Sequence, residues 1–233
     1  MLRCGHDSDG VRMQYHYVKV WDGFVRANHW LILGLMVVSF ATARAHRMDW
    51  HMLSGYAVLT LLIFRVLWGF LGSQSARFAS FVASPGAALR QLGKLREAGP
   101  DRETSHNAAG GWMVLLLLGL LILQAVTGLF TYDQIFTYGP LARRAPEWVV
   151  DWASSIHVRN FYWLLVAVVL HVVAVGVYRA QKGHDLLGPM IHGTKKLPAD
   201  VAAPSMAPAG LGLTLLAVSA GIVWGITKLR IGF

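Results

Sequence analysis

The sequence predicts an all-α integral membrane protein, in which a four-helix transmembrane bundle is followed by a fifth C-terminal transmembrane helix. The first reason is composition: 55% of the 233 residues are hydrophobic and 14% are charged, whereas an average soluble domain carries about 25% charge. The second is that the apolar residues gather in long blocks, which is typical of membrane spans. The third is that the lysines and arginines lie between these blocks. A free-standing soluble enzyme is therefore excluded, and the single cysteine, Cys4, excludes a disulfide scaffold.

Five apolar blocks define the organisation of the chain, each close to the ~20 residues that a helix needs to cross ~30 Å of hydrocarbon. They cover roughly residues 25–43, 50–71, 109–131, 155–178 and 208–227. We therefore expect a polar tail over 1–23, a four-helix domain over 24–196, and a connector with the additional helix over 197–233. The tail has no apolar segment like that of a signal peptide, so we expect it to be retained.

The distribution of positive charge predicts the orientation. Thirteen of the 21 lysines and arginines fall in the tail and in the second and fourth connections, and seven fall on the opposite side. The positive-inside rule then places the N-terminus in the cytoplasm and the C-terminus outside. Because this placement explains the net charge of +9, no nucleic-acid partner is expected. We call the side of the N-terminus the inner side and the opposite side the outer side.

Four of the ten histidines lie within the expected spans, where ionisable side chains are costly and usually functional. His29 lies near the inner end of the first block, His51 lies at the outer end of the second, and His157 and His171 both lie in the fourth. The 14 residues from His157 to His171 turn a helix through about 1400°, within about 40° of whole turns, so both project from one face. The rise of about 21 Å puts them near opposite sides of the bilayer.

Each histidine of the fourth block needs a partner at its own depth. Depth matches His157 with His51, which we call the outer pair, and His171 with His29, which we call the inner pair. Neutral imidazole is a good ligand for haem iron, and bundles build cofactor sites from facing helices. We therefore predict two b-type haems with bis-histidine iron; Cys-x-x-Cys-His is absent from the sequence, which excludes a c-type haem. A structural hydrogen bond or a proton relay is the alternative role for these histidines.

Four further residues are candidates for contact with these haems. Gly55 lies one turn after His51 and would leave room for a flat macrocycle, although small residues also pack membrane helices. Arg65 and Arg159 could pair with haem propionates, and snorkelling to the headgroups explains them almost equally well. His106, at the inner start of the third block, could reach an inner propionate.

Several runs of residues resemble bacterial cytochromes b561 and hydrogenase-type di-haem cytochrome b subunits. The resemblance covers about residues 20–196 and includes Arg26, which enters the cofactor-binding candidates as the first residue of an Arg-x-x-His-Trp run. The matching runs are Arg26-Ala27-Asn28-His29-Trp30, His51-Met52-Leu53-Ser54-Gly55-Tyr56, Phe64-Arg65-Val66-Leu67-Trp68-Gly69-Phe70, His106-Asn107, the pair His157 and His171, and the segment from His184 to Gly193.

The resemblance implies a four-helix core in the bacterial inner membrane, whose two b haems move electrons between quinone and a partner redox protein. That partner would be a periplasmic c-type cytochrome or a dehydrogenase subunit, docking on the outer connection 132–154. If quinone or quinol is the substrate, the protein is formally an oxidoreductase. A haem-bearing membrane anchor of a dehydrogenase or hydrogenase complex is the alternative, and a histidine-lined transporter ranks lower because the first four spans contain no Asp or Glu. A homodimer is compatible with this pattern.

Overall fold

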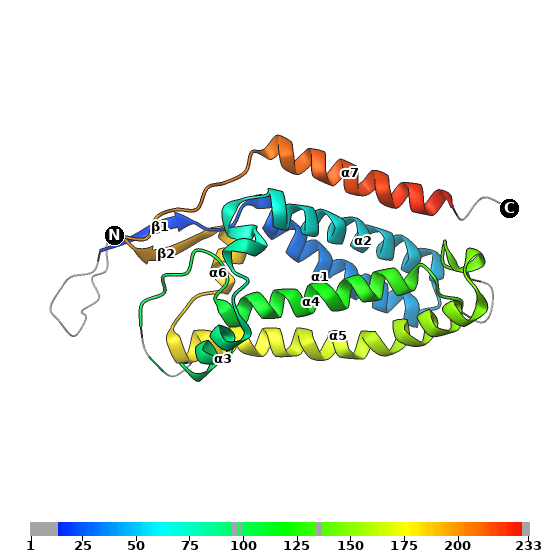
Figure 1. Ribbon diagram of the computed structural model, residues 1–233, viewed down its shortest axis with the longest axis horizontal. Coiled ribbons are helices and arrows are strands. Elements are labelled where there is room, and N and C mark those ends of the chain that lie inside the picture. Colours follow the sequence, from blue (N-terminus) through cyan, green and yellow to red (C-terminus); the bar gives the residue numbers. More distant parts are fainter. Residues whose placement is uncertain (1–13, 95–96, 98, 134–136, 230–233) are drawn as a thin grey trace. The chain divides into compact units, whose positions relative to one another are not determined.

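A computed structural model of the chain describes residues 14–94, 97, 99–133 and 137–229. The first thirteen residues of the expected tail therefore lie outside the described residues. Within the described part, five helices are long and apolar enough to cross a membrane. Figure 1 shows them as α1 (Gly23–Arg44), α2 (Met48–Leu71), α4 (Ala108–Gly128), α5 (Glu147–Lys182) and α7 (Ala209–Lys228). The predicted helical membrane fold is confirmed.

The helix ends follow local chemistry. The Asp22 carboxylate accepts a hydrogen bond from the backbone N–H of Val25 at 2.8 Å, which caps the first turn of α1. α5 is longer than its apolar block, with 36 residues and hence a length of about 54 Å. This exceeds the ~30 Å hydrocarbon core, because the helix begins two turns before the apolar block, in a stretch that mixes Glu147 and Asp151 with aromatic and small apolar residues.

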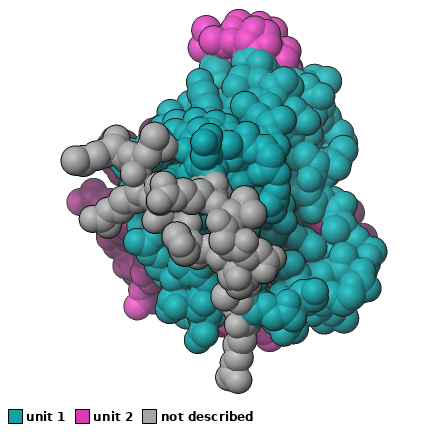
Figure 2. Space-filling model, turned by 90° about the vertical axis from the view of Figure 1, so that its left-hand side faces the viewer, with its two compact units in different colours: residues 1–26, 69–113, 171–207 teal, residues 27–68, 114–170, 208–233 magenta. Residues whose placement is uncertain are grey.

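The described chain forms two compact units, shown in different colours in Figure 2. The first contains residues up to 26, 69–113 and 171–207, and the second contains 27–68, 114–170 and the residues from 208. The second unit is the apolar helical bundle, and we call it the bundle unit. The first unit carries the connections and strands, and we call it the cap unit.

Two clusters of buried apolar side chains hold the bundle unit together. One is centred on Ile32, Val58 and Leu62, so α1 and α2 contribute to it, and partly buried leucines of α4 pack against it. The other joins Leu59 of α2, Leu129 after α4 and Val223 of α7. Val223 is 4% exposed, so α7 packs against the bundle through a buried side chain.

The cap unit contains the short elements. Strands β1 (Tyr15–Lys19) and β2 (Thr194–Pro198) form an antiparallel pair, in register from Tyr15 opposite Pro198 to Lys19 opposite Thr194. The other elements are the 3₁₀ turns η1 (Gln74–Ala76) and η2 (Phe78–Ser80) and the helices α3 (Pro85–Gly93) and α6 (Leu187–His192). A further turn, η3 (Ala142–Arg144), belongs to the bundle unit.

Candidate functional site

One face of α5 is buried and carries both of its candidate histidines. The most buried side chains at its centre are Asn160, Leu164 and Ala167, which are 4%, 2% and 3% exposed. These residues alternate by three and four positions, as one face of a helix does, and the same spacing continues to His157 on one side and His171 on the other. The two histidines therefore lie on the face that α5 turns toward its neighbours, at nearly equal distances from the helix ends.

The bundle unit brings the outer pair together. The ring centres of His51, on α2, and His157, on α5, are 6.1 Å apart, and their planes meet at 89°. Two ring nitrogens that bind one metal ion from opposite sides each lie about 2 Å from it, which sets the ring centres about 6 Å apart. The arrangement suits two imidazoles that share one ion.

Backbone carbonyls fix the orientation of both rings. Nδ1 of His51 lies 2.9 Å from the carbonyl oxygen of Ser39 on α1, and the Ser39 hydroxyl lies 3.1 Å from the same nitrogen. Nδ1 of His157 lies 2.9 Å from the carbonyl oxygen of Gln124 on α4. A carbonyl can only accept, so each Nδ1 carries the proton and donates it. The lone pair of each ring is then on Nε2, where it is available to a metal ion.

Two polar residues beside His157 were missed in the sequence. Gln124 donates from its amide nitrogen to the carbonyl oxygen of His157 at 2.9 Å. Asn160 donates to the Gln124 amide oxygen at 2.8 Å and to the carbonyl oxygen of Leu120 at 2.9 Å. An amide side chain inside an apolar helix is costly unless it is bonded. That cost is the signal by which Gln124 and Asn160 could have been found.

The inner pair is divided between the two units. His29 lies on α1 in the bundle unit, half-buried, with its ring edge-on to Trp30 at 5.0 Å between centres. His171 lies on α5 at the start of the third segment of the cap unit, also half-buried. Their pairing therefore stays a prediction, which rests on the helical spacing along α5 and on their expected depths.

A comparison with known protein families decides the class of this bundle. The family described as prokaryotic cytochrome b561 matches residues 20–193, about three quarters of the chain. This chain belongs to the prokaryotic cytochrome b561 family. As a member of the cytochrome b561 family, it is a multi-pass membrane b-type cytochrome of electron transfer, and membership implies a b-type haem. The matched range contains all four candidate histidines and excludes α7. Comparisons with curated proteins and with solved structures found no match.

The residues of this cytochrome b561 family member fit a haem at the outer pair. The ring separation suits a shared iron, and both Nδ1 atoms are engaged elsewhere. No atom lies within 4 Å of the point where a Cβ on Gly55 would stand, which leaves space one turn from His51. At Gly128 a Cβ would stand 2.9 Å from Cε1 of His157, so the absence of a side chain lets that ring approach α4.

The remaining candidates of the cytochrome b561 pattern lie in different surroundings. In the cap unit, Nη1 of Arg26 donates to the carbonyl oxygen of Ile191 at 2.5 Å, which ties α1 to α6. His106 lies between the rings of Trp21 and Phe81, with centres 4.9 Å away in both cases. In the bundle unit, Arg65 is half-buried on α2 and Arg159 is exposed on α5. A contact of these four residues with haem stays a prediction.

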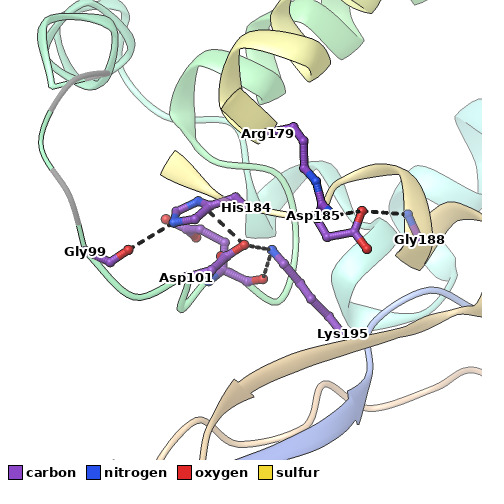
Figure 3. A network of polar contacts seen from close by, with 8 residues as sticks. Gly99, Asp101, Arg179, His184, Asp185, Gly188 and Lys195 are labelled. Atoms are coloured by element: carbon purple, nitrogen blue, oxygen red, sulfur yellow. Dashed lines mark hydrogen bonds and ion pairs between the residues drawn. The ribbon is translucent and has the colours of Figure 1, made fainter. Parts of the chain in front are cut away.

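A second group of titratable residues lies in the cap unit (Figure 3). Nζ of Lys195 on β2 lies 2.6 Å from the Asp101 carboxylate, and these side chains are only 9% and 11% exposed. Nδ1 of His184 lies 3.6 Å from the same carboxylate. Lys195 also donates to the carbonyl oxygen of Glu103 at 3.0 Å. We call these four residues the cap cluster.

The cap cluster changes the pKa of the Glu103 carboxyl. The residue as a whole is exposed, but partial desolvation of its carboxyl raises its pKa above the ordinary value of 4.5. The negative charge of Asp101 acts in the same direction, and the positive charge of Lys195 opposes it. The carboxyl therefore holds its proton to a higher pH in the folded protein than in the unfolded chain.

Proposed function

We propose that this chain is a di-haem cytochrome b that passes electrons across the membrane between the quinone pool and a partner redox protein. His51 and His157 would bind the outer haem iron, and His29 and His171 would bind the inner one. The observation that carries the proposal is the outer pair: two half-buried imidazoles have ring centres at a separation that suits one shared iron, and each has Nδ1 committed to a carbonyl.

Bound b-type haem supplies one-electron redox chemistry, and the work of the chain is ligation, alignment and exclusion of water. α5 contributes to both sites, since one continuous helix bears His157 and His171 on one face about 21 Å apart along its axis. Between them this face carries Asn160, Leu164 and Ala167, all almost completely buried. The amide nitrogen of Asn160 is itself satisfied by Leu120 and Gln124, so this buried stretch is suited to excluding water.

The outer connection offers the partner protein a surface of mixed chemistry. The rings of Tyr132 and Tyr138 stack with centres 4.1 Å apart, and the guanidinium of Arg143 lies over the Tyr138 ring. These residues line a hollow of about 490 Å³ together with Glu147 and Asp151 from the first turns of α5. The backbone N–H of Tyr132 donates to Ser154, one turn before His157. A protein docked on this surface would therefore contact residues that are bonded to α5 one turn from His157, a proposed ligand of the outer haem.

The test is a reduced-minus-oxidised visible spectrum of the purified protein, with haem per chain measured as the pyridine haemochrome. We expect two b haems per chain in the wild type and one in each of His51→Ala and His29→Ala. His46→Ala, in the turn between α1 and α2, is the matched control and should keep both. Reduction by a soluble quinol should be lost in protein prepared without haem.

The ring planes of the outer pair give a second measurement on the same sample. Imidazole planes close to perpendicular, as the 89° angle has them, produce a highly anisotropic low-spin ferric signal in electron paramagnetic resonance. His51→Ala should remove one such signal. Folded wild-type protein that was made with haem available and carries none would refute the proposal.

A further inference from the structure

Gln124 and Asn160 form a closed set of hydrogen bonds around His157 in the bundle unit. Gln124 accepts from the ring at its carbonyl oxygen and donates to the backbone of His157 from its side chain, both at 2.9 Å. It therefore holds the histidine at two points. Asn160, one turn along α5, fixes the Gln124 side chain by donating to its amide oxygen at 2.8 Å.

The hydrogen bonds of Gln124 affect the basicity of the His157 ring as well as its position. Gln124 lies four residues before α4 ends at Gly128, and its backbone carbonyl is a strong hydrogen-bond acceptor. An Nδ1–H that donates to such a carbonyl makes the imidazole a more basic ligand. A more basic ligand stabilises ferric iron more than ferrous iron. The Thr127 hydroxyl also reaches the Gln124 carbonyl, at 3.1 Å, and competes for it.

His51 has a different environment on the other side of the pair. Its Nδ1 faces Ser39, whose carbonyl and hydroxyl belong to the same residue of α1. Both contacts of Ser39 are to the ring nitrogen of His51, whereas Gln124 bonds the ring and also the backbone of His157. The amide network is therefore specific to His157, and its removal should leave His51 in place.

We propose that Gln124 and Asn160 are positioning residues that lower the reduction potential of the outer haem by holding the ring of His157 against the backbone carbonyl of Gln124. The inference rests on the proposed function, because it requires a haem at the outer pair. It assigns control of the outer haem's reduction potential to two uncharged side chains, which do not themselves bind the iron.

The experiment is a potentiometric titration of both haems in three purified variants. Gln124→Met and Asn160→Leu keep the side-chain volume close to the original and remove the amide bonds. Ser219→Ala is the matched control, because Ser219 is a fully buried polar residue of α7 whose hydroxyl donates to the Leu215 carbonyl of its own helix. Haem per chain is measured on every sample before titration.

We expect both amide variants to keep two haems and to raise the potential of the outer haem alone. The ratio of reduced to oxidised outer haem at a fixed potential should rise about threefold to tenfold, and tenfold corresponds to ~59 mV for one electron. Ser219→Ala should leave both potentials unchanged.

Three results would overturn the inference. One is an unchanged outer potential in variants with two haems, and another is an equal shift in Ser219→Ala. The third is loss of the outer haem from both amide variants, since the amides would then be required for retention rather than for the potential. Wild-type protein without haem would instead overturn the proposed function.

Discussion

The bundle unit and the cap unit both bury polar side chains, and they satisfy them in different ways. In the bundle, the polar residues around His157 are uncharged amides, and their partners are mostly backbone carbonyls. In the cap, Lys195 and Asp101 form an ion pair. The two units therefore satisfy their buried polar side chains with different partners, backbone carbonyls in one and an opposite charge in the other.

The difference indicates which group is functional. A buried ion pair can be built wherever two segments meet, and it is weak evidence for anything but a specific contact. Uncharged groups that orient two imidazoles and leave one nitrogen of each available serve a ligand rather than each other. The comparison therefore favours a ligand site in the bundle and a structural cluster in the cap, and the following changes test this hypothesis.

The largest effect is expected from Gly55→Leu in the bundle. A leucine side chain would fill the space beside His51, so we expect one of the two haems to be lost, as measured by the pyridine haemochrome. Gly221→Leu on α7 is the control, because a Cβ there also has no neighbour within 4 Å. If Gly55→Leu kept both haems, Gly55 would face lipid and not a macrocycle.

In the cap, Lys195→Met should destabilise the fold without changing haem content. It leaves the buried Asp101 carboxylate without its counter-charge, and breaking such a pair costs about 3–5 kcal/mol. Thermal unfolding in detergent would measure this loss, and the double variant Lys195→Met with Asp101→Leu should recover much of it. A haem content that fell with the single variant would contradict the structural role.

A smaller and pH-dependent effect is expected at Glu103. Its raised pKa means that the folded protein binds a proton more readily than the unfolded chain, so its contribution to stability is lost as the pH rises. Glu103→Gln should therefore unfold at a higher temperature than the wild type at neutral pH. The advantage should shrink as the pH falls towards 4.5, the ordinary pKa of the group. An advantage independent of pH would exclude titration of Glu103 as its cause.

The smallest effect is expected from Arg102→Ala. Arg102 pairs with Asp200 at the surface, where the two side chains are 50% and 65% exposed. The hydrogen bond from Arg102 lowers the pKa of the Asp200 carboxyl, so any stabilisation is present at neutral pH and is lost as the pH falls. Water screens such a pair, and we expect no measurable change in the unfolding temperature. A change as large as that of Lys195→Met would remove the contrast between buried and exposed pairs.

The sequence was sufficient to predict the features that depend on neighbouring residues within one helix. The five helices follow from apolar blocks of the right length, and the common face of His157 and His171 follows from the turn of one helix. The resemblance to the cytochrome b561 family is confirmed by the family match. Haem ligation by the four histidines stays a prediction, since the contact between His51 and His157 is geometry from which ligation is inferred.

The features that could not be predicted depend on contacts between distant segments. β1 pairs with β2 across nearly the whole chain, from Tyr15 to Pro198, and five-residue strands have no periodicity by which to recognise a partner. Asp101 and Lys195 belong to two such distant segments. Gln124 and Asn160 differ, because amides within apolar helices were visible in the sequence, and only their mutual distance was unknown.

The connector before α7 has a consequence for how the chain is assembled. Its Ser205 accepts a hydrogen bond from the backbone of Gln74, and its Ala207 donates to the Ser73 hydroxyl, both just after α2. α7 leaves the ribosome after the other four membrane helices. By then the turn that follows α2 has already been synthesised, so both partners of these hydrogen bonds exist as soon as the connector emerges. The connector that leads into the last of the five helices is thus tied to the segment that follows the second.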